Sequence, residues 1–314
     1  MEFGLSRTGS YDDLLSDARW AEKNGLCSIC ISDHFLRAGA DDRSRAADLP
    51  SSDPFVHLAG LARETSAISL GVMVASVTFR HPAVVLKSAI DLDIMSGGRF
   101  TLGLGTGYRE SEHEIFGIPF PPLRDRYHLL EENLEYVRAG LATPNPGFEG
   151  ELYRLKPHPI APRPTGRVRI MVGGGGARRT PSIAGRYADE YNIFPMEPDE
   201  MRARIAVARA ACAAAGRNPG HLVLSSGGPI ITGETQAEFR DDLTHHARHA
   251  RMDMDELQCD HRENHRLVGT YAEVAQRLAE LAEVGISRFY IRFEGDGLMD
   301  RERLLSTLRS VAPG

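Results

Sequence analysis

Four consecutive glycines, Gly173 to Gly176, follow an apolar run and precede a helix-like segment in RIMVGGGGARRTPSIA (169–184). Without Cβ atoms, their backbone can approach an anion closely and turn its N–H groups toward it. Thr180 has the character of an N-cap and Pro181 that of a first helical residue, so the positive end of a helix dipole would lie beside the same anion. The spacing matches neither GxGxxG nor a P-loop. It predicts an anion site, and a plain tight turn is the alternative.

An acid–histidine pair, Asp33 and His34, follows the apolar run Ser28 to Ile31. Histidine side chains exchange protons near neutral pH, and a neighbouring carboxylate can orient or charge the ring. We therefore predict that His34 transfers a proton and that Asp33 is its partner. An isolated Asp-His dipeptide is usually a surface pair. Its position at the end of a strand favours the catalytic interpretation.

The elements that must position these residues alternate between strand and helix. Eight short apolar runs have the length of strands, and the third of them is rich in β-branched residues. They are Glu2–Leu5, Cys27–Ser32, Ile68–Val77, Phe100–Leu104, Val168–Val172, Glu190–Phe194, His221–Ser225 and Arg288–Phe293. Amphipathic or capped segments lie between most of them, and they predict helices at Tyr11–Asn24, Asp53–Thr65, Pro82–Met95, Arg124–Leu141, Thr180–Tyr187, Pro198–Ala215, Tyr271–Val284 and Asp300–Val311.

This alternation predicts one α/β domain over residues 1–314, an eight-stranded parallel barrel of the TIM type with insertions. One expected insertion is a β-hairpin at Phe148–Leu155. A doubly wound open sheet is the alternative, but no dinucleotide fingerprint follows the first strand. In a barrel the carboxyl ends of the strands share one rim, so Asp33 and His34 would meet three later segments there. These are Thr78–His81, Gly105–His113 and Gly173–Arg179.

Composition limits the classes of partner. The 314 residues carry a net charge of −6 with acidic and basic residues interspersed, which argues against a nucleic-acid or anionic-membrane surface. The sequence contains no apolar run of about eighteen residues and no basic-then-apolar leader at MEFGLSRTGS. We expect a cytoplasmic protein that acts on a small molecule, with no nucleic-acid or membrane partner.

Neither the cysteines nor the histidines predict a metal site. The four cysteines, Cys27, Cys30, Cys212 and Cys259, are too few and too scattered for a disulfide framework. The segment Thr244–His265 is rich in histidine, and His245 and His249 are spaced i, i+4, but no carboxylate completes a known ligand set. We expect a solvated or lid-like helix there and no bound metal.

At this point the chain resembles the luciferase-like flavin and deazaflavin oxidoreductases, and within them the group that depends on coenzyme F420. The resemblance covers nearly the whole length, with its motifs in family order and spacing. The motifs are ISDHF (31–35), LARETSAISLG (61–71), the block from Phe79 to Tyr127 that includes GTGYRESEHEIFGIPFPPL, IMVGGGGARRT (170–180), YADEYNIF (187–194) and LVGTYAEVAQRLAELAEVGISRFYIRF (267–293).

The resemblance implies a barrel with the cofactor ring over the carboxyl ends of its strands. His34 corresponds to the family histidine that protonates substrate or steadies a reduced cofactor. A non-proline cis peptide bond would lie near Met73 and Val74. The cofactor phosphate would rest on Gly173, Gly174, Gly175 and Gly176, with Arg178 or Arg179 near it. Gly105, Thr106 and Gly107 would pass close to the cofactor tail, and the substrate side would be bordered by Tyr108, Glu112 and His113.

Some positions depart from known branches of the family. The sugar-phosphate dehydrogenase branch has a tryptophan and an acid where this chain has Ala38 and Tyr108, which argues against glucose 6-phosphate as the substrate. Cys30 and Tyr191 replace common tryptophans, and either reshape the pocket floor or repack the core.

We favour hydride transfer between F420 and an electron-poor C=C, C=N or carbonyl group, or the reverse, with His34 supplying the proton. One alternative is a monooxygenase that takes reduced FMN from a separate reductase; another is a non-catalytic cofactor-binding protein. The sequence does not identify the substrate, because the segments that would shape its site are variable loops: Leu36–Ser52, Tyr108–Leu123 and Arg240–His265. Helix faces near Trp20 and Val84 could pack against a second copy in a homodimer or cover the barrel instead.

Overall fold

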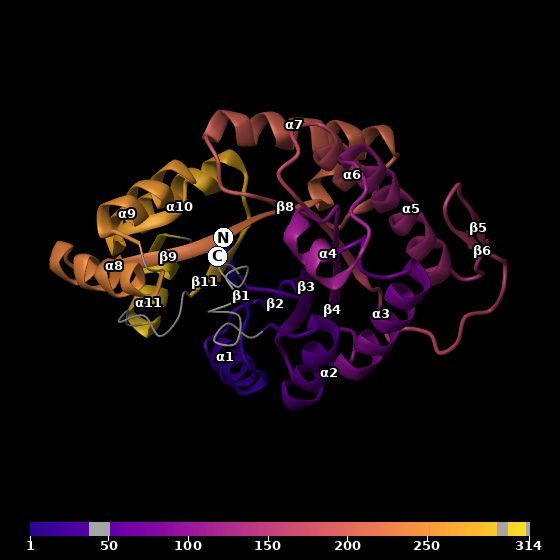
Figure 1. Ribbon diagram of the computed structural model, residues 1–314, viewed down its shortest axis with the longest axis horizontal. Helices are drawn as coiled ribbons and strands as arrows, with labels where there is room; N and C mark the ends of the chain where they lie inside the picture. Colours follow the sequence, from indigo (N-terminus) through magenta and orange to yellow (C-terminus); the bar gives the residue numbers. More distant parts are fainter. Residues whose placement is uncertain (38–50, 251, 294–300, 312–314) are drawn as a thin grey trace.

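The computed structural model describes residues 1–37, 51–250, 252–293 and 301–311, without the side chains of residues 249 and 310. Within these residues eight parallel strands close into a barrel, in the order β1-β2-β3-β4-β7-β8-β9-β11 and back to β1 (Figure 1). The predicted barrel is therefore confirmed. Its strands are β1 (Glu2–Arg7), β2 (Ser28–Ile31), β3 (Ser69–Ser76), β4 (Phe100–Gly105), β7 (Arg169–Gly173), β8 (Glu190–Ile193), β9 (Val223–Gly233) and β11 (Arg288–Arg292).

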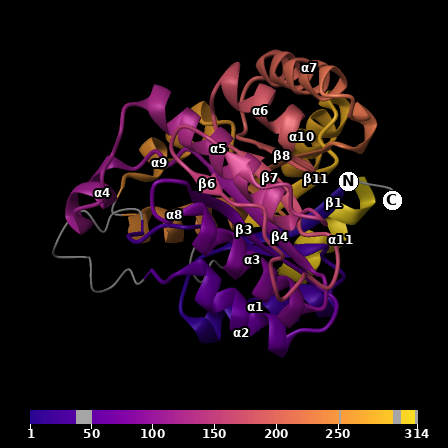
Figure 2. The same cartoon turned by 90° about the vertical axis from the view of Figure 1, so that its right-hand side faces the viewer.

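Helices cover the outside of the barrel (Figures 1 and 2). Four of them begin at a side-chain cap: Ser10 forms a capping box with Asp13, and the side chains of Asp53, His81 and Thr270 accept from backbone N–H groups of the helices that they precede. The covering helices are α1 (Tyr11–Lys23), α2 (Pro54–Glu64), α3 (Pro82–Ser96), α5 (Leu123–Leu141), α6 (Arg179–Tyr187), α7 (Pro198–Ala214), α10 (Tyr271–Val284) and α11 (Arg301–Val311).

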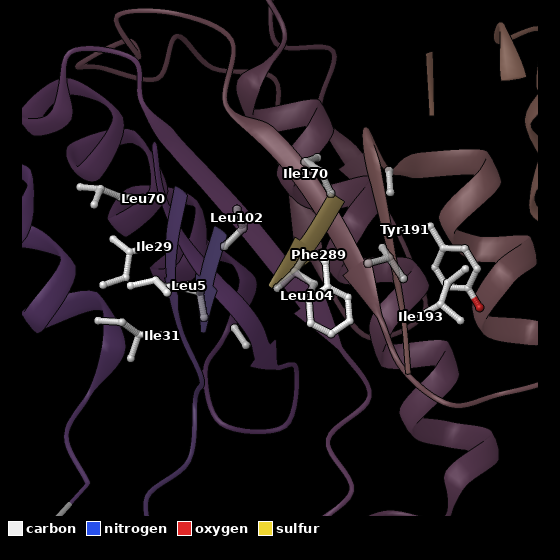
Figure 3. Close-up of a cluster of buried hydrophobic side chains, with 14 of the residues drawn as sticks. Leu5, Ile29, Ile31, Leu70, Leu102, Leu104, Ile170, Tyr191, Ile193 and Phe289 are labelled. Carbon is white, nitrogen blue, oxygen red and sulfur yellow. The ribbon is translucent and has the colours of Figure 1, made fainter. Parts of the chain in front are cut away.

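Alternate residues of each strand face the helices, and the others face the barrel interior. The outward residues form the main apolar core, which includes Leu5, Ile29, Leu102, Ile170, Tyr191 and Phe289 (Figure 3). A separate interior cluster joins strands that are not neighbours: Cys30, Met171 and Tyr290 are buried together, with Met73 and Val74 packed against them. Tyr191 is thus a core residue, whereas Cys30 lies beneath the pocket wall that Met73 and Val74 form. Ala38 lies outside the described residues.

The insertions were only partly predictable. The hairpin of β5 (Phe148–Glu149) and β6 (Arg154–Leu155) is confirmed. Two elements were not predicted, α4 (Glu110–Phe116) and β10 (Leu267–Thr270), along with a 3-10 turn at Pro219–His221. Where one helix was expected within Thr244–His265, the structure has two, α8 (Gln236–Ala250) and α9 (Met254–Glu263). Figure 2 shows α4 at the end of the barrel opposite the N-terminus, so it stands over the carboxyl ends of the strands.

Strand β9 continues past its predicted end at Ser225. Its first half pairs with β8 and β11, and its second half, from Ile230, pairs with β10. The glycine pair at 227–228 is typical of a turn, but a Cβ at Gly227 would lie 2.8 Å from the Tyr290 Cβ. Glycine therefore serves here to let the neighbouring strand β11 approach closely at Tyr290.

The histidine-rich segment is more packed than predicted. Helices α8 and α9 bury a small apolar cluster against β9 and β10, and His246 and His261 are themselves buried. The side-chain arrangement of His245 and His249, which are spaced i, i+4, lies outside what the structure describes, because the side chain of residue 249 is not among the described side chains. Among the side chains that are described, no three His, Cys, Asp or Glu residues are arranged to hold a metal ion. No described helix is both long and apolar enough to cross a membrane.

The contact between α6 and α7 depends on one glycine. A Cβ at Gly185 would overlap the carbonyl oxygen of Ala208 and lie 2.9 Å from the Ala211 Cβ. Alanine is favoured over glycine within a helix by about 1 kcal/mol. The close approach should reverse that preference.

We predict that Gly185→Ala lowers the free energy of unfolding by about 1–3 kcal/mol, because the added methyl group forces the two helices apart. Urea unfolding followed by circular dichroism measures the change. Gly166→Ala is the matched control, since its Cβ would meet only ordinary contacts at 3.8 Å. A Gly185→Ala variant as stable as the control would contradict the packing argument.

Candidate active site

A cavity of about 670 Å³ opens at the carboxyl-end side of the barrel, and all eight barrel strands, or the segments that follow them, contribute lining residues. Most residues singled out in the sequence stand in its wall. These are Asp33, His34, Met73, Val74, Gly105, Thr106, Gly107, Tyr108, Glu112, His113, Gly173, Gly174 and Gly175. Gly176, Arg178 and Arg179 lie outside it.

His34 stands at the end of β2 with one ring nitrogen held by the protein. Its Nδ1 lies 3.0 Å from Oε2 of Glu112, and its Nε2 lies 3.4 Å from the Tyr108 hydroxyl. The Tyr108 ring meets the imidazole edge-on, at a centroid distance of 5.4 Å. His34 has 26% of its side chain exposed, and Tyr108 is 71% exposed, so the pair is accessible from the cavity.

Glu112 is the buried partner that His34 requires, although the sequence placed it on the substrate side. Its second oxygen, Oε1, accepts from the Leu36 amide at 2.8 Å and faces Arg109 Nη1 at 3.4 Å. Burial alone would raise the pKa of Glu112, but the hydrogen bonds from His34 and Leu36 and the charges of His34 and Arg109 lower it. Glu112 is therefore an ionised carboxylate with both oxygens engaged.

The prediction that Asp33 orients His34 is wrong, because both Asp33 oxygens are held elsewhere. Arg80 donates to them in a bidentate pair, at 2.6 and 3.0 Å, and the Ser76 amide donates at 3.1 Å. Arg80 also donates to Asp53, the N-cap of α2, at 2.6 Å. Burial lowers the pKa of Arg80, but the bonds with the two aspartates outweigh it and raise the pKa. Asp33 thus ties the end of β2 to the end of β3 and the start of α2.

His113 is buried beside the cavity with both ring nitrogens bonded within the protein. Nδ1 lies 2.8 Å from the Arg109 carbonyl, which can only accept, so Nδ1 carries a hydrogen. In the neutral ring, Nε2 then accepts from the Thr78 hydroxyl at 2.7 Å, and Thr78 in turn accepts from Ser76 at 2.7 Å. This assignment follows from the hydrogen-bond partners. His113 holds α4 against the end of β3.

Helix α4 brings Glu112 and His113 inward and was not predicted. The local signals are modest: acidic residues in its first turn, and Gly117 in the left-handed region at its C-terminus, where the Ile118 amide donates to the His113 carbonyl. Arg109, just before the helix, also donates to the carbonyls of Leu36 and Arg37. The helix and the segment after β2 are therefore clamped together.

The glycines at the ends of β4 and β7 lie against the side chain of Val74. A Cβ at Gly105 would lie 2.6 Å from Val74 Cγ2, and one at Gly173 would lie 3.1 Å from Val74 Cγ1. Their missing side chains make room for Val74. The peptide bond between Met73 and Val74 is cis, so that expectation is confirmed. Gly107 has φ of +69°, and a Cβ there would overlap the Ser76 hydroxyl.

Gly174 and Gly175 remain as open backbone in the cavity wall. Gly174 has φ of +149°, which favours glycine, and a Cβ at either position would meet only ordinary contacts of 3.4 Å or more. A side chain there would occupy space that is otherwise part of the cavity. Gly176 is different, because a Cβ there would overlap the Tyr127 hydroxyl.

The prediction for the start of α6 needs two corrections. The helix begins at Arg179, without a side-chain cap, and Thr180 instead hydrogen-bonds the Tyr127 hydroxyl at 2.9 Å. Arg178 and Arg179 line a separate depression of about 400 Å³. The Arg179 guanidinium lies over the Tyr127 ring, 4.6 Å from its centroid, and 3.5 Å from Glu131. Neither arginine stands in the wall beside Gly174.

Sequence reasoning missed several wall residues from the other half of the barrel. Asn192 lies near the end of β8, and its side-chain amide donates to the Ser225 hydroxyl at 3.0 Å. Arg7, at the end of β1, forms an ion pair with Asp17 of α1. Their signal was only their position at strand ends. The remaining wall residues of this half include Ser6, Thr8, Phe194, Gly227, Gly228, Arg292 and Phe293.

Comparison with known proteins gives a consistent result. The family model described as luciferase-like monooxygenase matches residues 2–288. A 172-residue stretch is 35% identical to the F420-dependent glucose-6-phosphate dehydrogenase of Kineococcus radiotolerans, covering 54% of this chain and 49% of that one. The enzyme of the same description from Amycolatopsis mediterranei is 30% identical over 180 residues, 57% of this chain and 52% of that one. The matches span about half the length of these relatives.

Solved structures agree on the fold. An F420-dependent secondary alcohol dehydrogenase in complex with an F420-acetone adduct superposes with a TM-score of 0.80, at 18% identity, over 99% of this chain and 98% of that one. A monooxygenase from Streptomyces bottropensis gives a TM-score of 0.77, at 23% identity, over 98% and 97% of the two chains. At these identities the likeness establishes the barrel and its topology.

The Glu112 network predicts a pH-dependent contribution to stability. Because the pKa of Glu112 is lowered in the folded protein, its stabilising effect is present above the ordinary glutamate pKa of about 4.3 and is lost as pH falls through the lowered value. We expect Glu112→Gln to reduce the free energy of unfolding by about 1–3 kcal/mol at pH 7. The difference from wild type should shrink progressively as the pH falls below about 4.3.

Urea titrations of both proteins from pH 7 to pH 3 measure this difference. Glu114→Gln, an exposed change on the same helix, serves as the control. A difference that stays constant over the whole range would contradict an ionised, hydrogen-bonded Glu112.

Proposed function

Because the chain belongs to the luciferase-like monooxygenase family, we propose that it is an oxidoreductase that moves a hydride between the deazaflavin F420 and a small organic substrate. The observation that carries the proposal is the His34–Glu112 pair, which faces a cavity with open glycine backbone elsewhere in its wall. A proton-transfer group and a surface for an anionic cofactor thus share one chamber.

The wall fits such a cofactor at two places. Gly174 and Gly175 leave space that any side chain would fill, and backbone of this kind suits the phosphate of a cofactor tail. Met73 and Val74 form an apolar floor above the interior cluster, which suits a flat ring system. We propose that Gly105, Thr106 and Gly107 border the same cofactor. Because the missing side chain of Gly105 admits Val74, the contribution of Gly105 would be one of shape.

The choice of F420 rests on the relatives. The two dehydrogenases described above carry F420 in their names, as does the secondary alcohol dehydrogenase of similar fold. When bound, a 5-deazaflavin supplies hydride chemistry, and the protein supplies orientation and proton transfer. Since the sequence matches span about half of those relatives, the cofactor and the substrate class stand here as proposals.

Side chains of the protein would accept and return the substrate proton. In the oxidising direction, Nε2 of His34 would accept the substrate O–H or N–H proton while the C–H hydride leaves for the bound cofactor. In the reducing direction, the same nitrogen returns that proton to the oxygen, nitrogen or carbon that gains it. Tyr108 and the aromatic Phe79 and Phe194 line the chamber and would limit the access of water.

We predict that His34→Asn retains F420 binding within about twofold but loses about 10²- to 10⁴-fold in turnover, because only the proton-transfer group is removed. The measurement follows cofactor absorbance with a panel of secondary alcohols, ketones, imines and enones. His158→Asn, at an exposed position, is the control.

Turnover at the wild-type level in His34→Asn would remove the catalytic role of His34. F420 binding without turnover of any acceptor by wild type would favour a binding protein. Oxygen consumption with reduced FMN, and no hydride transfer with F420, would favour a monooxygenase.

A further inference from the structure

The two oxygens of Glu112 face different partners, and this difference has a chemical consequence. Oε1 is committed to hydrogen-bond donors, the Leu36 amide at 2.8 Å and the Arg109 guanidinium at 3.4 Å. Oε2 lies 3.0 Å from Nδ1 of His34. The Glu112 side chain is 1% exposed, so water does not compete for these positions. The carboxylate is fixed in one orientation.

An ionised carboxylate can only accept a hydrogen bond. The Leu36 amide and Arg109 both stabilise that ionised form, so His34 must present a hydrogen on Nδ1 to make its contact. In the neutral imidazole, Nε2 is then the unprotonated nitrogen. It is also the nitrogen that faces the Tyr108 hydroxyl and the cavity.

We propose that Glu112 is a positioning residue that holds neutral His34 as the Nδ1–H tautomer, so that Nε2 is the proton acceptor of the site. The role of Nε2 in proton transfer rests on the proposed function, whereas the assignment of the His34 tautomer does not. When oxidised F420 is bound as the hydride acceptor, the substrate O–H or N–H bond would break as its C–H hydride leaves, its proton would bond to Nε2, and the resulting imidazolium would be paired with the Glu112 carboxylate. The reverse reaction returns the same proton from Nε2.

The same carboxylate also links His34 to the rim of the cavity. Arg109 and Glu112 together hold the Leu36 amide and the carbonyls of Leu36 and Arg37. The orientation of the ring and the position of the segment that follows His34 therefore depend on one side chain of α4. A residue 78 positions away in sequence fixes the chemistry of His34.

The Glu112→Gln variant should invert the tautomer. The Leu36 N–H and Arg109 require an acceptor, so they would retain the oxygen of the new amide and direct its NH₂ group toward His34. Nδ1 would then have to accept, and the ring hydrogen would move to Nε2. Inversion without loss of the hydrogen bond distinguishes positioning from a merely structural role.

The experiment is two-bond ¹H–¹⁵N correlation on the full chain with ¹⁵N-labelled histidine and no added ligand, at a pH where the ring is neutral. His34→Asn identifies the His34 signals by their loss. We expect a hydrogen on Nδ1 in wild type and in the Glu114→Gln control, and on Nε2 in Glu112→Gln. A wild-type spectrum with the hydrogen on Nε2 would overturn the proposal even if the Gln variant failed to fold, as would an unchanged tautomer in a folded Gln variant.

Kinetics give a second readout where turnover is measurable. Glu112→Gln should lower kcat in the oxidising direction by about 10²- to 10⁴-fold, the range expected for loss of a general base, with KM within about threefold. An increase in KM at unchanged kcat would contradict positioning. Absence of F420 turnover in wild type would defeat the proposed function, yet the spectra would still decide the tautomer.

Discussion

Burying a carboxylate requires that every oxygen find a donor, and this requirement organises the rim of the barrel. Two carboxylates are buried there, each satisfied by a different set of donors. Asp33 accepts hydrogen bonds from Arg80 and the Ser76 amide, and Arg80 also donates to Asp53. This network joins β2, β3 and α2. The Glu112 carboxylate is hydrogen-bonded to the Leu36 amide, Arg109 and His34, and these bonds join α4 to the segment after β2. Removing one partner of such a group leaves an uncompensated charge, which typically costs about 3–5 kcal/mol.

The second constraint is steric. Val74, beside a cis peptide bond, projects toward β4 and β7, and both strands carry glycines where its methyl groups lie. The interior cluster of Cys30, Met171 and Tyr290 supports Met73 and Val74 from below. The floor of the cavity is therefore built from packed side chains, while Gly174 and Gly175 leave backbone open in its wall. A rigid floor and a charged rim are what a site needs to hold a ligand against a proton-transfer group.

Sequence pattern predicted the barrel because the strands carry short apolar runs and several helices carry their own caps. It missed α4, whose seven residues are too few for a helical period, and it ended β9 early because Gly227 resembles a turn residue. It placed His34 correctly in the cavity wall but gave it the wrong partner. Asp33 is adjacent in sequence, whereas the contact with Glu112 spans 78 positions and exists only after folding. The cis bond at Met73–Val74 was expected from family resemblance alone.

The central claim is that the open glycine backbone in this cavity belongs to an F420 site. Fluorescence titration of the wild-type protein with F420, and separately with FMN, tests it most directly when repeated with Gly174→Asp. Gly97→Asp is the matched control, because Gly97 is exposed and also has a positive φ, of +68°, with open space around it. The account predicts micromolar binding of F420 to wild type and Gly97→Asp, weakened at least about tenfold in Gly174→Asp. No F420 binding by wild type, or equal binding by Gly174→Asp, would contradict it.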